Sequence, residues 1–183
     1  MALSTPIVST FVHADAPFLY WIGLASAQSG AVQFAISHNK TTRVGITGRS
    51  SIYKSNNFGA SWAQLEGFPY NATLAKFGGL QAVACDAYCQ TVMVAAYNAG
   101  IYISTNFGTN WSVSIFSRLV GLVNGWNSVS CDSSGVYLAA AGSYGNIIVS
   151  SNSGLSWNNS SAPFSTVIGM VYLLVELVNI SQL

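Results

Sequence analysis

The chain has 183 residues, which is enough for one domain or for part of a larger one. Hydrophobic residues make up 51% and aromatic residues 13%, so a core can be filled, but only 6% of residues are charged. The net charge is +1 and the basic residues are scattered, which excludes a nucleic-acid interface built from many Lys and Arg contacts. The longest apolar stretch, 167–178, is shorter than the about 18 residues of a membrane-spanning helix and contains Glu176. The sequence therefore predicts no transmembrane segment.

A first repeat unit begins near Pro17. The stretch Pro17–Leu24 is apolar, and Ala-Ser-Ala at 25–27 resembles a signal-peptide cleavage site, but no Lys or Arg precedes it. The segment Trp21–Gly30 instead aligns with Trp126–Gly135, since both begin with Trp and end with Ser-Gly. We therefore expect the entry to a first β-strand here rather than the core of a signal peptide.

The first unit carries an insertion. Between Gly30 and Ser55 lie 25 positions, where the third unit has 15 between Gly135 and Ser150. The extra residues fall around Ser37–Arg49, and departures of this kind on loops are where binding usually occurs. We predict that contacts with a ligand involve the basic residues of this insertion and aromatic residues beside strand turns: Lys40, Arg43, Arg49, Tyr70, Tyr97 and Tyr144.

The second and third units align without a gap over 82–104 and 128–150. Each contains three apolar runs separated by Gly, Asn or Ser turns, which is typical of short strands. A fourth strand is expected to begin at the Trp that follows. Four strands in 46–49 residues form one blade of a β-propeller, so the predicted fold is all-β. We predict blades at 17–66, 67–115 and 116–162, the last strand of a preceding blade in 1–16, and a divergent C-terminal segment at 163–183.

Each unit contains the same phrase, Ser-x-Asn-x-Gly-x-x-Trp, and its tryptophans are separated by 49 and then 46 residues. The Ser ends a strand, and the Asn side chain is expected to accept backbone hydrogen bonds in a tight turn. The Gly supplies a left-handed backbone conformation, and the Trp packs between sheets. These residues are predicted to be structural: Ser55, Asn57, Gly59, Trp62, Ser104, Asn106, Gly108, Trp111, Ser150, Asn152, Gly154 and Trp157.

The phrase resembles the repeat of the Asp-box, or BNR-repeat, β-propellers, whose pattern is Ser-x-Asp-x-Gly-x-Thr-Trp. Asn57, Asn106 and Asn152 stand where the family has Asp. The resemblance covers about residues 18–162 and implies a propeller of four-stranded blades. It does not select one function, because the repeat occurs in sialidases, xyloglucan-degrading glycosidases, sortilin-type receptors and photosystem II assembly factors.

An enzyme of the sialidase type would need an arginine cluster, a Tyr–Glu nucleophile pair and an Asp acid. The arginines are Arg43, Arg49 and Arg118, and none lies in the family's Arg-Ile-Pro context. Glu66 with Tyr70 is the sole candidate nucleophile pair by proximity in the sequence. Glycoside hydrolysis normally needs two carboxylates that face the bond to be cleaved, and no convincing pair remains among the five acidic residues: Asp15, Glu66, Asp86, Asp132 and Glu176. Asp86 and Asp132 occupy equivalent repeat positions, which favours a structural role for both.

The three cysteines form no Cys-x-x-Cys motif, and neither histidine lies near them in sequence, so no metal site and no cofactor are predicted. Cys85 and Cys131 are equivalent and are expected to be small buried strand residues, while Cys89 can pair with either one under oxidising conditions. Six Asn-x-Ser/Thr sequons and the low charge favour a secreted protein. They occur at Asn39, Asn71, Asn110, Asn158, Asn159 and Asn179.

Closed propellers have four to eight blades, whereas three are found here. Two explanations remain open: the chain is a fragment of a larger propeller, or copies of it close a ring as a homo-oligomer. The function favoured by the sequence is a non-catalytic propeller module that binds protein or glycan ligands or acts as a scaffold. A degenerate or truncated sialidase-like glycoside hydrolase is the alternative.

Overall fold

A computed structural model describes residues 20–38, 50–69, 79–97, 99–113, 125–142 and 147–160. These residues form three four-stranded antiparallel sheets, each of which follows the chain order without a crossover. Among the described residues there is no helix long and apolar enough to cross a membrane. The predicted segments 1–16 and 163–183 lie outside the described residues.

Sheet 1 comprises β1 (Tyr20–Ser26), β2 (Gln33–His38), β3 (Ser50–Ser55) and β4 (Ala63–Gln64). Sheet 2 comprises β5 (Leu80–Cys85), β6 (Val92–Ala96), β7 (Gly100–Ser104) and β8 (Ser112–Val113). Sheet 3 comprises β9 (Trp126–Cys131), β10 (Leu138–Gly142), β11 (Ile147–Ser150) and β12 (Asn158–Asn159). The expectation of an all-β protein with four strands per unit is confirmed, and β1 includes most of the stretch that resembled a signal peptide.

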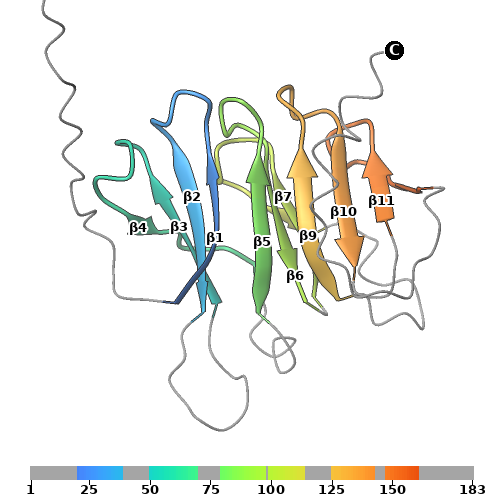
Figure 1. Cartoon of the computed structure of the whole chain (residues 1–183), viewed down its shortest axis with the longest axis horizontal. Coiled ribbons are helices and arrows are strands. Elements are labelled where there is room, and N and C mark those ends of the chain that lie inside the picture. The colour runs from blue at the N-terminus through green and yellow to red at the C-terminus, as the bar shows by residue number, and fades with distance from the viewer. Residues whose placement is uncertain are drawn as a thin grey trace, which may run out of the picture.

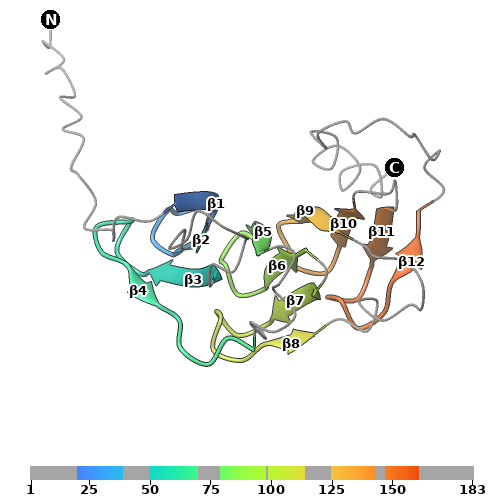
Figure 2. The ribbon, with the colours of Figure 1, turned by 90° about the horizontal axis from the view of Figure 1, so that it is seen from below.

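The sheets are stacked in series, with β1, β5 and β9 along one side of the stack and the short strands β4, β8 and β12 along the other (Figures 1 and 2). This is the arrangement of successive propeller blades, whose first strands line the central axis. Because side chains alternate along a strand, every sheet has two faces. We call the face toward the preceding sheet the front face and the face toward the following sheet the rear face.

Apolar side chains fill the two spaces between the sheets. Between sheets 1 and 2, the rear-face residues Phe34, Ile36 and Ile52 pack with Val92 and Val94 of the front face of sheet 2. A second set fills the space between sheets 2 and 3: Met93, Ala95, Ile101 and Ile103 on one side and Leu138, Ala140 and Ile148 on the other. The core therefore consists mainly of two equivalent layers. A smaller buried cluster lies on the rear face of sheet 3, where Ala139 and Ala141 pack with Ile147.

A polar contact also joins sheets 1 and 2. The Ser50 hydroxyl oxygen accepts a hydrogen bond from the buried Leu80 N–H (3.1 Å) and lies 3.1 Å from His38 Nδ1. A side chain at the Gly79 position would overlap both His38 and Ser50, so the backbone of sheet 2 approaches sheet 1 closely here. This contact satisfies a backbone donor that would otherwise be buried without a partner.

Replacing Phe34 by Ala should lower the free energy of unfolding by about 3–5 kcal/mol, because it leaves a cavity in the layer between sheets 1 and 2. Phe34 is fully buried, whereas Phe58, in a turn of the same sheet, is 72% exposed. Phe58→Ala is therefore the matched control and should change stability by less than about 0.5 kcal/mol. Urea unfolding followed by tryptophan fluorescence measures both, and equal effects would contradict the assignment of the core.

Candidate functional site

The three Ser-Asn-Gly-Trp phrases form nearly identical turns, here called the repeat turns (55–62, 104–111 and 150–157). In the first, the Ser55 hydroxyl donates to Asn57 Oδ1 (2.9 Å) and accepts from the Gly59 N–H (3.0 Å), while Asn57 Oδ1 also accepts from the Ser61 N–H (2.9 Å). The corresponding bonds recur in the other two turns. The polar side chains of the repeat turns are thus engaged with their own backbone and leave little for a ligand.

The residue before each turn glycine also has a left-handed backbone, which sequence reasoning missed. The φ angles are 59° at Phe58 and Phe107 and 56° at Ser153, each followed by a glycine with φ between 79° and 84°. Two consecutive left-handed residues reverse the chain sharply, and the hydrogen bonds of the Ser hydroxyl support that reversal. No signal in the phrase marks this position, because its residue type varies between Phe and Ser.

A second set of turns joins the first two strands of each sheet; we call them the hairpin turns (27–30, 86–89 and 132–135). The Asp86 carboxylate accepts hydrogen bonds from the N–H groups of Tyr88, Gln90 and Thr91 (2.7–3.0 Å). The Asp132 carboxylate accepts from the N–H groups of Ser134 and Tyr137. These bonds give both carboxylates a structural role, and in the first hairpin turn Ala27 takes the equivalent position.

The two aspartates differ in their surroundings. Asp86 is 5% exposed, because Gly135 of sheet 3 lies over it. Asp132 is less covered. Partial burial raises the pKa of its carboxyl, but the hydrogen bonds from Ser134 and from backbone amides outweigh this effect and hold the pKa below its usual value. A lowered pKa stabilises the fold above the unfolded-state pKa, and this stabilisation is lost as the pH falls through the folded-state pKa.

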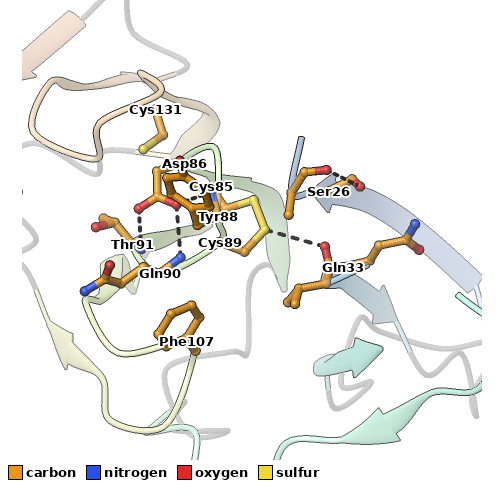
Figure 3. The surroundings of a disulfide bond; sticks show 12 residues. Ser26, Gln33, Cys85, Asp86, Tyr88, Cys89, Gln90, Thr91, Phe107 and Cys131 are labelled. Carbon is orange, nitrogen blue, oxygen red and sulfur yellow. Dashed lines mark hydrogen bonds between the residues drawn. A yellow bond between two sulfur atoms is a disulfide. The ribbon is translucent and has the colours of Figure 1, made fainter. Parts of the chain in front are cut away.

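Cys85 and Cys89 form a disulfide across the second hairpin turn, on the side that faces sheet 1 (Figure 3). Cys89 Sγ lies 3.8 Å from the Val32 carbonyl oxygen of sheet 1. Cys131 is a free thiol; burial and then the negative charges of Asp86 and Asp132 raise the pKa of this thiol to about 12. Cys89 therefore pairs with Cys85 and not with Cys131.

The front face of sheet 1 carries an apolar cleft of about 360 Å³, and no other described sheet covers it. The cleft is lined by Trp21, Gly23, Leu24, Trp62 and the buried Ala35. The Trp21 ring makes an edge contact with Tyr53 (5.1 Å between ring centres) and a tilted contact with Trp62 (6.1 Å). Leu24 is 62% and Trp21 37% exposed, so large apolar side chains face solvent here.

The repeat explains why this face is apolar. In sheet 2, the equivalent positions belong to the layer that packs on sheet 1 or border it: Leu80, Val83, Val94, Tyr102 and Trp111. In sheet 3, the equivalent positions likewise form or border the layer that packs on sheet 2: Trp126, Val129, Ala140, Ile148 and Trp157. The five residues of the cleft and its border thus form the same type of interface, without a described sheet against it: Trp21, Leu24, Ala35, Tyr53 and Trp62.

Polar groups lie at one border of the cleft. The Tyr53 hydroxyl donates to Gln64 Oε1 (3.4 Å), and Gln64 Nε2 donates to the Ser51 hydroxyl (3.4 Å). Burial raises the pKa of Tyr53, so its hydroxyl remains protonated at neutral pH. The cleft therefore offers aromatic surface with a few uncharged hydrogen-bonding groups, which suits binding by apolar contact better than catalysis.

The predicted contact residues are only partly described. Lys40, Arg43, Arg49, Tyr70 and Tyr144 lie outside the described residues. Tyr97 is half-buried; its N–H donates to the Gly79 carbonyl (3.1 Å), and it pairs with Gly125 as an isolated β-bridge. The backbone of Tyr97 therefore links sheets 2 and 3, and the contact with a ligand stays a prediction for all six residues.

Lys54 is a basic residue that the sequence analysis did not single out. Its ammonium group donates to the Phe107 carbonyl (2.9 Å) and lies over the rings of Phe34 (5.5 Å) and Phe107 (5.9 Å). Partial burial lowers the pKa of Lys54. The side chain joins sheet 1 to the second repeat turn, so it is part of the interface between sheets.

The described acidic residues do not form a catalytic pair. Glu66 is exposed after β4, and its proposed partner Tyr70 lies outside the described residues. The oxygens of Asp86 and Asp132 are occupied by backbone donors, as shown above. Within the described ranges, no group of three His, Cys, Asp or Glu side chains is placed to hold a metal ion.

No protein-family model and no curated protein matches the sequence. Solved structures do match. YCF48 from Cyanidioschyzon merolae is similar at TM-score 0.56 and 16% identity, over 80% of this chain and 38% of that protein. A structure of YCF48 bound to D1 peptide is similar at TM-score 0.57 and 11% identity, over 77% of this chain and 40% of that protein. A GH74 enzyme from Niastella koreensis is similar at TM-score 0.57 and 18% identity, over 79% of this chain and 23% of the enzyme. These similarities define the fold as that of a β-propeller, and the chain spans less than half the length of each of these proteins.

Thiol titration tests the cysteine assignments. Without reductant, the unfolded protein should show one reactive thiol, that of Cys131, because Cys85 and Cys89 are bonded. The native protein should react very slowly at pH 8, since a thiol with a pKa of about 12 has almost no thiolate at that pH. Cys131→Ser, the control, should show no thiol even when unfolded. Three thiols in the unfolded wild type would contradict the disulfide.

Proposed function

We propose that this chain is a non-catalytic, Asp-box-type β-propeller module, with blades at 17–66, 67–115 and 116–162, that binds a protein ligand through the front face of sheet 1. The observation that carries the proposal is the exposed apolar cleft between Trp21, Leu24 and Trp62. Equivalent residues in sheets 2 and 3 pack against the neighbouring sheet of the same chain, so this surface has the composition of a packing interface. Contiguous exposed apolar surface of this kind marks interaction sites.

The other features of the molecule agree with a binding role. The carboxylates of Asp86 and Asp132 serve the hairpin turns, which leaves the alternative of a degenerate glycoside hydrolase without a described acid–base pair. One structural neighbour, YCF48, is bound to a peptide, and this example supports a protein ligand for a propeller of this fold. A glycan remains the competing ligand class, because two tryptophan rings border the cleft.

Selection from a random peptide library tests the proposal. Peptides selected on the wild-type protein should be rich in aromatic and aliphatic residues. They should bind Leu24→Asp at least about tenfold more weakly, a difference of about 1.4 kcal/mol, because the charge would be buried against an apolar ligand. Leu155→Asp is the matched control, since Leu155 is an exposed leucine in the third repeat turn, and binding to it should be unchanged. Titration of tryptophan fluorescence measures both affinities.

Two results would overturn the proposal. Selected peptides that bind Leu24→Asp as well as wild type would place the binding surface elsewhere. Binding of xyloglucan oligosaccharides that is weakened by Trp62→Ala would favour the glycan alternative. Hydrolysis of a fluorogenic sialoside or of xyloglucan by the purified protein would favour the enzyme alternative.

A further inference from the structure

We propose that the end of the stack formed by the hairpin turns and the repeat turns, here called the turn end, binds the surface of a zwitterionic lipid bilayer. Its exposed apolar side chains enter the interfacial region of the bilayer, while the sheets remain outside it. Binding of this kind needs no segment that spans the membrane. The inference goes beyond the proposed function, because it concerns a different surface from the cleft of sheet 1.

The six turns form one surface. Successive strands of each sheet run in opposite directions, so both kinds of turn lie at the same end of the stack, the upper end in Figure 1. Within each sheet, an N–H of the repeat turn donates to the carbonyl of the residue that follows the hairpin turn (2.9–3.2 Å): Phe58 to Ala31, Phe107 to Gln90 and Ser153 to Val136. The two turns of one sheet are therefore bonded to each other.

Further backbone hydrogen bonds connect the hairpin turns of neighbouring sheets. The Gln28 N–H of sheet 1 donates to the Ala87 carbonyl of sheet 2 (2.8 Å), and the Ala87 N–H donates to the Ser133 carbonyl of sheet 3 (3.2 Å). These three residues are equivalent, each being the second of its hairpin turn, and the Ser133 N–H has no acceptor among the described residues. The turn end is thus held together as a unit and does not consist of six independent loops.

Large apolar side chains are exposed at the turn end in all three sheets. The most exposed are Phe58 in sheet 1 (72%), Tyr88 in sheet 2 (73%) and Leu155 in sheet 3 (85%). Phe107, in the second repeat turn, and Tyr137, close to the third hairpin turn, are also exposed. Exposed apolar surface shared by several elements marks a site of interaction with a protein or a membrane.

The fold does not require apolar residues at these positions. Where the second hairpin turn has Tyr88, the other two have serine. Where the third repeat turn has Leu155, the first has alanine and the second has threonine. The turns nevertheless have the same hydrogen bonds in all three sheets, so the apolar side chains are additions to a turn that forms without them. A role in binding accounts for them, whereas a role in folding does not.

The turn end carries little charge. Its six turns contain no Lys, Arg or Glu. Of their two aspartates, Asp86 is buried, and Asp132 is partly covered and accepts hydrogen bonds from nearby backbone N–H groups. Lys54, which directly precedes the first repeat turn, donates to the Phe107 carbonyl. The turns therefore have no basic cluster that would attract anionic lipids, and apolar contact is the driving force for binding.

Polar groups of the turns are already bonded within the protein. In each repeat turn, the Ser hydroxyl and the Asn side-chain oxygen accept hydrogen bonds from N–H groups of the turn itself, as described above for Ser55 and Asn57. A polar group that keeps its hydrogen bond loses less free energy on leaving water than one without a partner. The repeat turns can therefore enter a partly dehydrated interface at low cost.

A lipid bilayer suits this arrangement better than a folded protein does. Protein interfaces bury their anchoring side chains together in a packed centre from which water is excluded. The apolar side chains of the turn end instead stand on separate turns, with Ser, Asn and Gly residues between them. A fluid interface accommodates separate side chains one by one, and tyrosine in particular is enriched at the interface between membrane and water.

Co-sedimentation with sucrose-loaded vesicles of phosphatidylcholine tests this inference. The bound fraction of the wild-type protein should rise with lipid concentration. It should be the same on vesicles that also contain phosphatidylserine and should not fall as salt is added, because no basic cluster contributes to binding.

Substitutions in each of the three sheets should lower the vesicle partition coefficient at least about fivefold, because each removes apolar area from the interface: Phe58→Ala, Tyr88→Ser and Leu155→Asp. Serine occupies the position of Tyr88 in the other two hairpin turns, so Tyr88→Ser should fold as the wild type does. Tyr20→Ser is the matched control. Tyr20 is 59% exposed but lies at the end of β1 that is far from the turns, so binding should be unchanged.

Any of three results rejects the inference: no binding to vesicles at any lipid concentration, equal loss of binding in Tyr20→Ser and Tyr88→Ser, or binding that requires phosphatidylserine and is abolished by salt. All three leave the proposed function standing, because its test is the loss of peptide binding in Leu24→Asp. Selected peptides that bind Leu155→Asp more weakly, but Leu24→Asp as well as wild type, would identify the turn end as a protein-binding surface and overturn both.

Discussion

The contact between successive sheets is the interaction on which the rest of this molecule depends. Each four-stranded sheet is too thin to have an interior of its own, so its apolar side chains are buried only where a neighbouring sheet lies against them. The two layers described here use equivalent residues and an equivalent backbone hydrogen bond between hairpin turns. Stability therefore increases with each sheet added, as in other repeat proteins, and no described sheet covers the front face of sheet 1.

This constraint also explains the candidate site. Trp21 and Trp126 are equivalent, yet Trp126 is 1% exposed and Trp21 is 37% exposed. The difference arises from position in the stack and not from residue type. The front face of sheet 1 has the residue types of a surface that packs between sheets, and no described sheet covers it. This explains why an aromatic cleft occurs in a chain with so few charged residues.

Much of the fold follows from residues that are visible in the sequence. The repeated Ser, Asn, Gly and Trp predicted the turns, and the alignment of 82–104 with 128–150 predicted four strands per sheet. The site was harder to predict, because Trp62, Trp111 and Trp157 are identical in the repeat and differ only in what covers them. The sequence analysis did not single out Lys54, whose position in the alternation along β3 directs it toward sheet 2. Tyr97, one of the predicted contact residues, is half-buried and its backbone pairs with Gly125, a bridge that the repeat did not indicate.

The central claim, that one inter-sheet contact repeats between the described sheets, is tested most directly by amide hydrogen exchange at three equivalent residues. In the wild-type protein, the N–H groups of Gln28 and Ala87 should be protected, because each donates to the next sheet. The N–H of Ser133 should exchange at nearly the rate of an unfolded peptide. Equal protection of all three, or no protection of Gln28 and Ala87, would contradict the account.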